Sequence, residues 1–174
     1  MNRIVLVTGG SRSGKSRYAL ELAAPYSTKA FIATAEALDP EMKARMEHHQ
    51  QQRDPAFLTV EEPVDLVSAL KSLPEKTEAA VVDCITVWLG NLFHRQKIND
   101  GTCGEIEGFC RILDTPPCHL ILVTNEVGMG IVPGDAVSRL YRDLAGSINQ
   151  RLARRAHEVI LIVCGIPLRV KSPE

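Results

Sequence analysis

The sequence predicts an α/β fold in which helices flank a mostly parallel central sheet. The first observation is a set of short runs of β-branched and aliphatic residues, which are typical of strands buried on both faces. The second is that segments with helical spacing separate these runs, so that strands and helices alternate. Ligands of such folds bind beyond the carboxyl ends of the strands. The loops after Val7, Ala33, Val82 and Val123 are therefore expected at one rim.

Each expected strand is a short apolar run that ends at glycine, proline or polar residues. In chain order, the expected strands are residues 4–7, 30–33, 58–60, 79–82, 119–123 and 159–163. The third is only a short extended piece, and the chain after Gly165 is expected to continue as a short extended tail.

The expected helices combine apolar spacing with a start or stop signal. Pro25 ends the first helix, Asp39 can cap the second, and Pro63 takes the first-turn position of the third. In chain order, the expected helices are residues 16–24, 39–53, 63–70, 85–93, 105–113 and 135–155. The stretch between the fourth and fifth helices is expected to form a loop.

Composition restricts the class of protein. A length of 174 residues corresponds to one ordinary domain, so we expect residues 1–174 to form a single domain. Hydrophobic residues make up 45% and charged residues 24%, as in globular proteins rather than disordered chains. A formal net charge of −1 and an aromatic content of only 5% argue against a nucleic-acid partner.

Three further features predict a cytoplasmic protein with no membrane partner. The apolar runs are far shorter than the roughly 20 residues needed to span a bilayer. The N-terminus does not have the pattern of a signal peptide. The five cysteines include no Cys-x-x-Cys pair, which indicates reduced thiols rather than a disulfide frame or a zinc site.

The strongest motif lies between the first strand and the first helix, where residues 9–16 fit G-x-x-x-x-G-K-[ST] without exception. Glycines let successive backbone N–H groups converge on phosphate oxygens, and the helix N-terminus adds partial positive charge. Lys15 can reach the β- and γ-phosphates, and the Ser16 hydroxyl can ligate Mg²⁺. The motif predicts a P-loop NTPase-like, RecA-like domain that binds nucleotide. Its residues are Gly9, Gly10, Ser11, Arg12, Ser13, Gly14, Lys15 and Ser16.

Asp83 directly follows the buried strand 79–82. A carboxylate at the end of a buried strand is costly unless it meets a cation or hydrogen-bond donors. Asp83 is therefore the expected second partner of Mg²⁺, directly or through water. The alternative is that Asp83 caps the helix that begins near Ile85.

A second candidate binding loop follows the strand 119–123. Two glycines and a proline within ten residues suggest a shaped loop, in which Thr124, Asn125 and Glu126 can contact phosphate, metal or substrate. The alternative is ordinary turn chemistry, followed by Asp135 as a helix cap.

Two adjacent histidines, His48 and His49, lie in the last third of the predicted helix 39–53. His49 shares a face with Met42 and Met46, which favours packing, whereas His48 lies on a more polar face. Periodicity therefore favours His48 if one of the two does chemistry, although surface histidine pairs most often have no catalytic role. A zinc site is not expected, because neighbouring helical positions point about 100° apart. The other three histidines show no such constellation.

These residues together resemble the bifunctional adenosylcobinamide kinase / adenosylcobinamide-phosphate guanylyltransferase family of cobalamin biosynthesis. The paired histidines and the loop of residues 125–128 make the resemblance more specific than the phosphate loop alone would. The matching segments are residues 8–16, 32–34, 39–49, 83–86, 124–133, 142–153 and 164–165.

The resemblance implies two reactions. The family phosphorylates the aminopropanol hydroxyl of adenosylcobinamide with ATP or GTP. It then transfers GMP from GTP to that phosphate through a guanylylated histidine, which matches His48 here, and the products are adenosylcobinamide-GDP and pyrophosphate. The resemblance also implies a homotrimer and nucleotide contacts beyond the phosphate loop. These contacts are Thr34, Ala35, Glu36, His49, Gln50, Gln51, Gln52, Glu61 and Asp83.

Two other functions stay open on the sequence. The first is a single-activity P-loop kinase for another small alcohol, in which His48 does no chemistry. The second is a nucleotide-dependent switch or regulatory binder, which would hydrolyse nucleotide slowly and have no acceptor substrate. A kinase of the first kind would trap no label from the α-phosphate of GTP.

Overall fold

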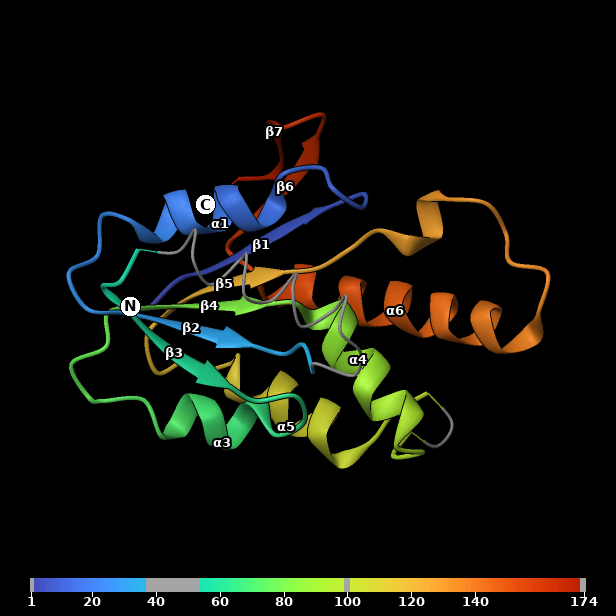
Figure 1. The fold of residues 1–174 in the computed structure, drawn as a ribbon, viewed down its shortest axis with the longest axis horizontal. Helices are drawn as coiled ribbons and strands as arrows, with labels where there is room; N and C mark the ends of the chain where they lie inside the picture. The colour runs from blue at the N-terminus through green and yellow to red at the C-terminus, as the bar shows by residue number, and fades with distance from the viewer. Residues whose placement is uncertain (1, 37–53, 99–100, 173–174) are drawn as a thin grey trace.

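The computed structural model describes residues 2–36, 54–98 and 101–172, and these residues form a seven-stranded sheet flanked by helices (Figure 1). The strand order is β3-β2-β4-β5-β1-β6-β7, in which the first six strands are parallel and β7 is antiparallel to β6. The α/β fold is therefore confirmed. The strands are β1 (Ile4–Gly9), β2 (Lys29–Ala33), β3 (Phe57–Glu61), β4 (Ala79–Asp83), β5 (His119–Val123), β6 (Glu158–Val163) and β7 (Ile166–Lys171).

Strand register brings the carboxyl ends of the parallel strands to one edge of the sheet, which we call the carboxyl edge. Val7 pairs with Val123 of β5, and Asp83 pairs with both Val123 and Ala33. The opposite edge, where the strands begin, is the amino edge. Because β5 lies between β1 and β4, the strand that precedes the phosphate loop is not a direct neighbour of the strand that ends at Asp83. A mostly parallel sheet was predicted from the sequence and is confirmed, but this strand order was not predicted.

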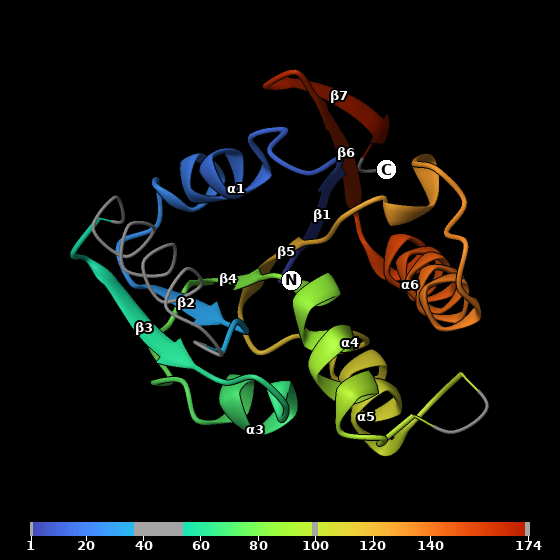
Figure 2. The same ribbon diagram turned by 45° about the vertical axis from the view of Figure 1, so that its right-hand side comes forward.

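The helices that the structure describes are divided unequally between the two faces of the sheet (Figure 2). Helix α1 (Lys15–Ala23) packs on one face against β1, β4 and β5. The other face carries α3 (Leu66–Lys71), α4 (Ile85–His94), α5 (Gly104–Ile112) and α6 (Ala136–Arg155). The core on this second face is the larger, and its biggest fully buried side chain is Trp88. Truncating such a residue to alanine typically costs about 3–5 kcal/mol.

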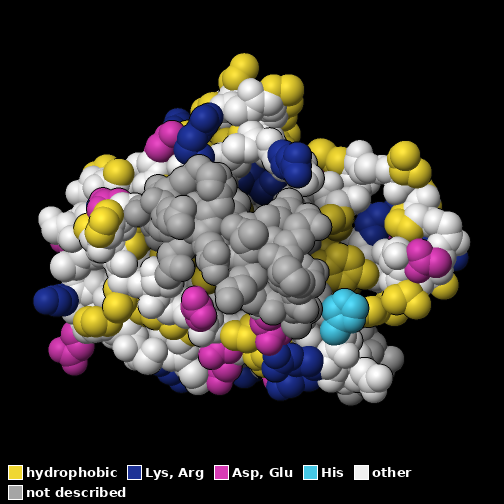
Figure 3. Space-filling view, in the orientation of Figure 1, with side chains coloured by type: hydrophobic (Ala, Val, Ile, Leu, Met, Phe, Trp, Pro, Cys, Tyr) yellow, Lys and Arg dark blue, Asp and Glu magenta, His cyan; other side chains and the backbone are white. Residues whose placement is uncertain are grey.

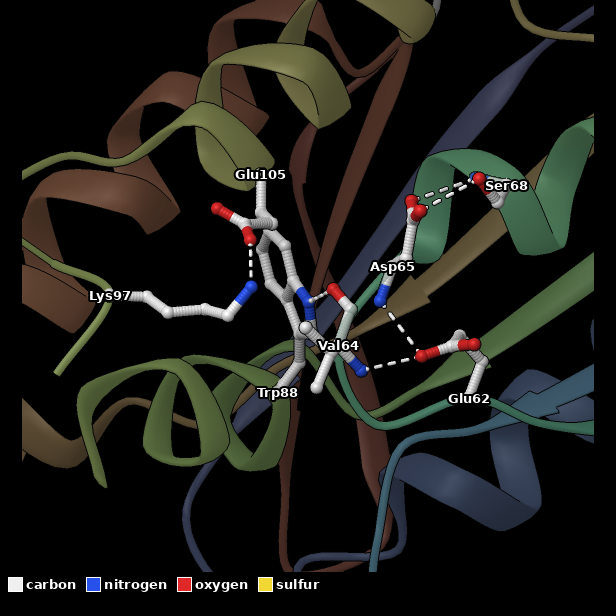
Figure 4. A network of polar contacts seen from close by, with 7 residues as sticks. All are labelled: Glu62, Val64, Asp65, Ser68, Trp88, Lys97 and Glu105. Carbon is white, nitrogen blue, oxygen red and sulfur yellow. Dashed lines mark hydrogen bonds and ion pairs between the residues drawn. The ribbon is translucent and has the colours of Figure 1, made fainter. Parts of the chain in front are cut away.

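The predicted third helix begins later than the sequence indicated, and its assignment to Pro63 is wrong. Helix α3 begins at Leu66, and the Asp65 side chain caps it by accepting from the backbone N–H of Ser68 at 2.9 Å. The Glu62 carboxylate accepts from the N–H groups of Val64 and Asp65, both at 2.8 Å (Figure 4).

Side chains of α4, which is distant in the sequence, also hold the turn before α3. The indole N–H of Trp88, on α4, donates to the carbonyl of Val64 at 2.7 Å, and Asn91 donates to the carbonyl of Pro63 at 3.0 Å (Figure 4 shows the Trp88 bond). These contacts hold residues 62–65 as a turn that local propensity does not reveal. Figure 4 also shows the ion pair between Lys97 and Glu105, which ties the end of α4 to α5.

Other predicted elements lie close to their expected bounds. The extended tail is a six-residue edge strand, β7, and a short 3₁₀ helix, η1 (Val127–Met129), lies in the loop after β5. The predicted helix 39–53 lies outside the described residues. Within the part of the chain that the structure describes, no helix combines the length and apolarity needed to cross a bilayer.

Candidate functional site

The phosphate loop has the strand–loop–helix geometry that the sequence predicted. It leaves β1 at Gly9, whose φ is 149°, and enters α1 through Gly14, a left-handed residue with φ 101° at the helix N-cap. A Cβ atom added to Gly9 would lie 2.4 Å from the carbonyl oxygen of Ile162 on β6. Glycine is therefore required at position 9 both for its backbone conformation and for the close approach of β6.

Lys15 is the buried cation of this loop, with an exposed fraction of 7%. Its Nζ donates to the carbonyl of Gly10 at 2.5 Å, so the ammonium group lies across the loop. Burial lowers the pKa of Lys15 below its ordinary value, and the nearby Cys84 and Asp83 oppose this shift. A desolvated ammonium interacts strongly with phosphate charge, because little water screens it.

The turn between β6 and β7 supports the phosphate loop from the side. The N–H of Gly165 donates to the carbonyl of Ser13 at 2.9 Å. The Ser13 hydroxyl is buried and makes no hydrogen bond to any described residue. A polar group in that state is costly unless a ligand satisfies it. Ser13 is therefore available to a bound phosphate.

Asp83 ends β4 at the carboxyl edge, and its charge acts on the pKa of Lys15. The alternative that Asp83 caps α4 is wrong, because the N-cap residue is Cys84, whose Sγ accepts from the N–H of Val87 at 3.4 Å. Burial raises the pKa of the Cys84 thiol to about 12, so this cysteine is not a nucleophile.

Thr34 joins the ends of two strands at the same edge. Its hydroxyl donates to the carbonyl of Cys84 and accepts from the N–H of Cys84, both at 2.8 Å. Its own N–H donates to the carbonyl of Asp83 at 3.1 Å. Thr34 thereby fixes the chain just after Asp83, and a direct contact between Thr34 and nucleotide stays a prediction.

The loop after β5 is tied to the phosphate loop by hydrogen bonds. Glu126 accepts from the hydroxyl of Thr8 at 2.6 Å through Oε1, and its N–H donates to the carbonyl of Gly9 at 3.1 Å. Asn149 of α6 donates to the same Oε1 at 3.1 Å and to the carbonyl of Asn125, also at 3.1 Å. The structure therefore brings Asn125 and Glu126 beside the predicted site.

Thr124 belongs to a buried extension of this cluster. Its hydroxyl donates to Oδ1 of Asn149 at 2.8 Å and lies 3.2 Å from the hydroxyl of Thr86. The Thr86 hydroxyl accepts from the N–H of Asn125 at 2.8 Å. Sequence reasoning missed the structural roles of Thr8, Thr86 and Asn149. Thr8 stands out in the sequence as a polar residue at the end of an apolar strand, whereas Asn149 lies on the largely polar α6 and gives no such signal.

The turn-chemistry alternative for this region is confirmed at its helix cap, and a contact of Thr124, Asn125 or Glu126 with phosphate, metal or substrate stays a prediction. The Asp135 side chain caps α6 by accepting from the N–H of Ser138 at 2.8 Å, as the turn-chemistry alternative predicted. The hydrogen bonds of Glu126 show that the loop is also part of the carboxyl edge.

The remaining predicted residues divide into two groups. Glu36 forms an ion pair with Arg95 at 2.6 Å, Ala35 adjoins it, and Glu61 ends β3, which three other strands separate from β1. His48, His49, Gln50, Gln51 and Gln52 lie outside the described residues. Within the described ranges, no three His, Cys, Asp or Glu side chains form a group that could hold a metal by themselves.

Comparisons with known proteins agree with this geometry. A family model described as "Cobinamide kinase / cobinamide phosphate guanyltransferase" matches residues 5–170. The chain is 39% identical to the bifunctional adenosylcobalamin biosynthesis protein CobU of Escherichia coli (strain K12), over 97% of this chain and 99% of that one. It is 41% identical to the bifunctional adenosylcobalamin biosynthesis protein CobP of Pseudomonas aeruginosa, over 96% of each chain.

A solved structure is also similar. It is the P4 protein from bacteriophage phi6 in complex with ADP, at 14% identity and a TM-score of 0.48, over 95% of this chain and 52% of that one.

Proposed function

This chain belongs to the cobinamide kinase / cobinamide phosphate guanyltransferase family, and on that basis we propose that it catalyses two consecutive reactions of adenosylcobalamin biosynthesis. The first phosphorylates adenosylcobinamide with ATP or GTP. The second transfers GMP from GTP to the new phosphate. The observation that carries this proposal is the phosphate loop of residues 9–16. It contains the buried Lys15 ammonium, and the hydrogen bond between Thr8 and Glu126 lies next to it at the carboxyl edge.

In the kinase reaction, the substrate hydroxyl attacks the γ-phosphorus and the nucleoside diphosphate leaves. The loop N–H groups, the N-terminus of α1 and Lys15 bind the phosphates and stabilise charge on the leaving group. Ser13, whose buried hydroxyl has no partner among the described residues, can donate to a phosphate oxygen. These residues supply positioning and electrostatic stabilisation, which account for most catalysis of phosphoryl transfer.

In the transferase reaction, neutral His48 is the nucleophile. One imidazole nitrogen bonds to the α-phosphorus of GTP while the bond to the β-phosphate oxygen breaks, and pyrophosphate leaves. An oxygen of adenosylcobinamide phosphate then attacks the same phosphorus, and the bond to His48 breaks. An unperturbed imidazole pKa of about 6.5 leaves a large neutral fraction at pH 7. The covalent intermediate divides one displacement into two easier ones.

Mg²⁺ fits the donors that this edge offers. Mg²⁺ usually keeps several waters and takes one or two protein oxygens together with substrate phosphates. The Ser16 hydroxyl at the start of α1 and the Asp83 carboxylate at the end of β4 would hold it in this way. Bound there, the ion would neutralise charge on the phosphates.

The proposal includes further assignments from the sequence. His49, Gln50, Gln51 and Gln52 are proposed to contact nucleotide, together with Thr34, Ala35, Glu36, Glu61 and Asp83. We also propose a homotrimer that acts in the cytoplasm on small-molecule substrates, without a nucleic-acid partner.

Labelling GTP at the α-phosphate tests the proposal. We expect wild-type protein to form a GMP–protein adduct and His48→Ala to form none, while His48→Ala still phosphorylates adenosylcobinamide. His49→Ala is the matched control and is expected to form the adduct. A kinase that phosphorylates its acceptor but traps no label would instead be a single-activity enzyme. A stable adduct on the His48→Ala protein would disprove the assignment of the nucleophile.

A further inference from the structure

Glu126 occupies a position at the carboxyl edge that neither reaction, as described above, has used. We propose that its carboxylate is the general base that accepts the proton of the adenosylcobinamide hydroxyl in the kinase reaction. This inference rests on the proposed function, because it assigns a residue to one of the two proposed reactions.

The two reactions differ in their need for a base. An alcohol must lose its proton as its oxygen bonds to the γ-phosphorus, so a positioned acceptor accelerates this step. The nucleophiles of guanylyl transfer are a neutral imidazole and an ionised phosphate, and both carry the attacking electron pair without losing a proton. A general base is therefore needed in the kinase reaction alone.

Position singles out Glu126 among the carboxylates of the described carboxyl edge. It follows β5, which is the direct neighbour of β1, and its N–H donates to the first glycine of the phosphate loop. Glu61 ends β3, which lies four strand spacings from β1, or roughly 19 Å. Glu36 is paired with Arg95, and Glu62 accepts from two backbone N–H groups. Asp83 is the proposed metal partner.

The hydrogen bonds of Glu126 orient it for this role. Thr8 of β1 and Asn149 of α6 both donate to Oε1, at 2.6 Å and 3.1 Å. No described residue donates to Oε2 within hydrogen-bond distance, and Glu126 is only half-buried. One oxygen thus anchors the carboxylate to the base of the phosphate loop, and the other is available to a substrate hydroxyl.

The residues that follow Glu126 offer apolar surface to a large acceptor. The chain that follows Glu126 carries exposed apolar side chains at the end of the molecule where α6 begins (Figure 3). These are Met129, Ile131, Val132, Val137 and Leu140. A bulky acceptor with apolar surface can therefore lie on this side of Glu126 while its hydroxyl reaches the phosphate loop.

The proton-transfer step balances without any further reactant. The oxygen of the hydroxyl bonds to the γ-phosphorus, and the bond between that phosphorus and the β-phosphate oxygen breaks. The proton passes from the hydroxyl to Oε2 of Glu126, and the nucleoside diphosphate leaves with the electron pair. Glu126 later returns the proton to water.

The variant Glu126→Gln tests the proposal. Glutamine keeps an oxygen that can accept from Thr8 and Asn149, but its amide cannot take a proton. We expect kcat for phosphorylation of adenosylcobinamide to fall about 10²- to 10⁴-fold, the usual contribution of a general base. Guanylylation of the protein and GMP transfer to supplied adenosylcobinamide phosphate should stay within about threefold of wild type. The exposed residue Glu75, before β4, gives the matched control Glu75→Gln, which should leave both reactions unchanged.

Each other outcome overturns the proposal. If the glutamine variant keeps its kinase kcat, Glu126 is not the base. If both reactions fall together, the residue only supports the phosphate loop. The variant Glu126→Asp is a second test in case Glu126→Gln does not fold. Aspartate keeps the carboxylate charge on a side chain that is one methylene shorter, so this variant should also lower the kinase kcat without lowering the transferase kcat. Wild-type protein that lacks either reaction would refute the proposed function itself, which separates that failure from this one.

Discussion

The two edges of the sheet differ in what they bury. Among the described residues, seven of the eight buried polar side chains lie at or beside the carboxyl edge: Thr8, Lys15, Thr34, Thr86, Asn91, Thr124 and Asn149. The amino edge has a hollow of about 480 Å³, lined by Asn2, Leu113, Asp114, Thr115, Pro116, Arg155 and His157.

The polar groups around the hollow at the amino edge are largely committed to the fold. Asn2 donates to the carbonyl of Pro116, and His157 accepts from the N–H of Ile4. Arg155 is paired with Asp114 at 2.9 Å. The difference indicates that buried polar side chains, which cost free energy unless something satisfies them, mark a functional edge better than a hollow does.

Replacing a buried lysine is expected to show the largest difference in activity between the edges. Lys15 lies at the carboxyl edge and Lys29 at the amino edge. We expect Lys15→Ala to lower both the kinase and the guanylyltransferase kcat/KM by about 10²- to 10³-fold, because it removes a desolvated cation that stabilises the transferred phosphates. Steady-state assays of each reaction measure this effect.

Lys29 is the matched control at the amino edge. It is equally buried but is paired with Asp54 at 3.1 Å and lies over the ring of Phe57. Lys29→Met should change the free energy of unfolding by no more than about 2 kcal/mol and leave both activities intact. Equal losses of activity in the two variants would remove the distinction between the edges.

Gly9 and Gly10, adjacent in the phosphate loop, are expected to differ in how much a substitution by alanine destabilises the protein. Gly9→Ala should lower the free energy of unfolding by about 2–4 kcal/mol, because its Cβ would clash with the carbonyl of Ile162 and its φ of 149° disfavours side chains. Gly10→Ala meets no atom within 4 Å and should change it by less than about 0.5 kcal/mol. Chemical denaturation without nucleotide measures both values. Similar values for the two variants would contradict this reading of the loop.

An exposed ion pair between α5 and α6 gives the smallest expected effect. Hydrogen bonds from Arg151 and Thr102 lower the pKa of Glu107 from 4.5 to about 2. A lowered pKa stabilises the folded state above pH 4.5, and this stabilisation is lost as the pH falls towards 2. Because the Glu107 side chain is 43% exposed, solvent screens the pair, and we expect Glu107→Gln to cost about 1 kcal/mol or less at pH 7.

Urea denaturation between pH 7 and pH 3 tests this contribution. The difference between wild type and Glu107→Gln should shrink as the pH falls, and both kinase and transferase activities should be unchanged at pH 7. A difference that grows towards acid pH would reverse the sign expected from the lowered pKa.

The features that could be predicted from the sequence are those that depend only on residues close together in the chain. Strand–loop–helix geometry around residues 9–16 is local, and so is the helix cap at Asp135. The start of α3 was missed because Trp88 and Asn91, more than 20 residues away, hold the turn before it. The alternative that Asp83 caps α4 was wrong, because the structure assigns the N-cap to Cys84.

The part of the site that escaped prediction depends on long-range contacts. Thr8 and Glu126 are separated by 118 residues, and their hydrogen bond follows only from the placement of β5 beside β1. Asn149 lies on α6, and periodicity cannot show that its amide reaches Glu126 rather than solvent. The residues were visible in the sequence, but their connection required the order of the strands.

The account depends on the phosphate loop as the place where the triphosphate binds. A crystal structure with Mg²⁺ and a GTP analogue that cannot be cleaved tests this most directly. We predict that the phosphates lie against the backbone N–H groups of residues 9–16, within reach of Lys15 and on the same edge as Asp83 and Glu126. A nucleotide bound instead in the hollow at the amino edge, with the phosphate loop empty, would contradict the account.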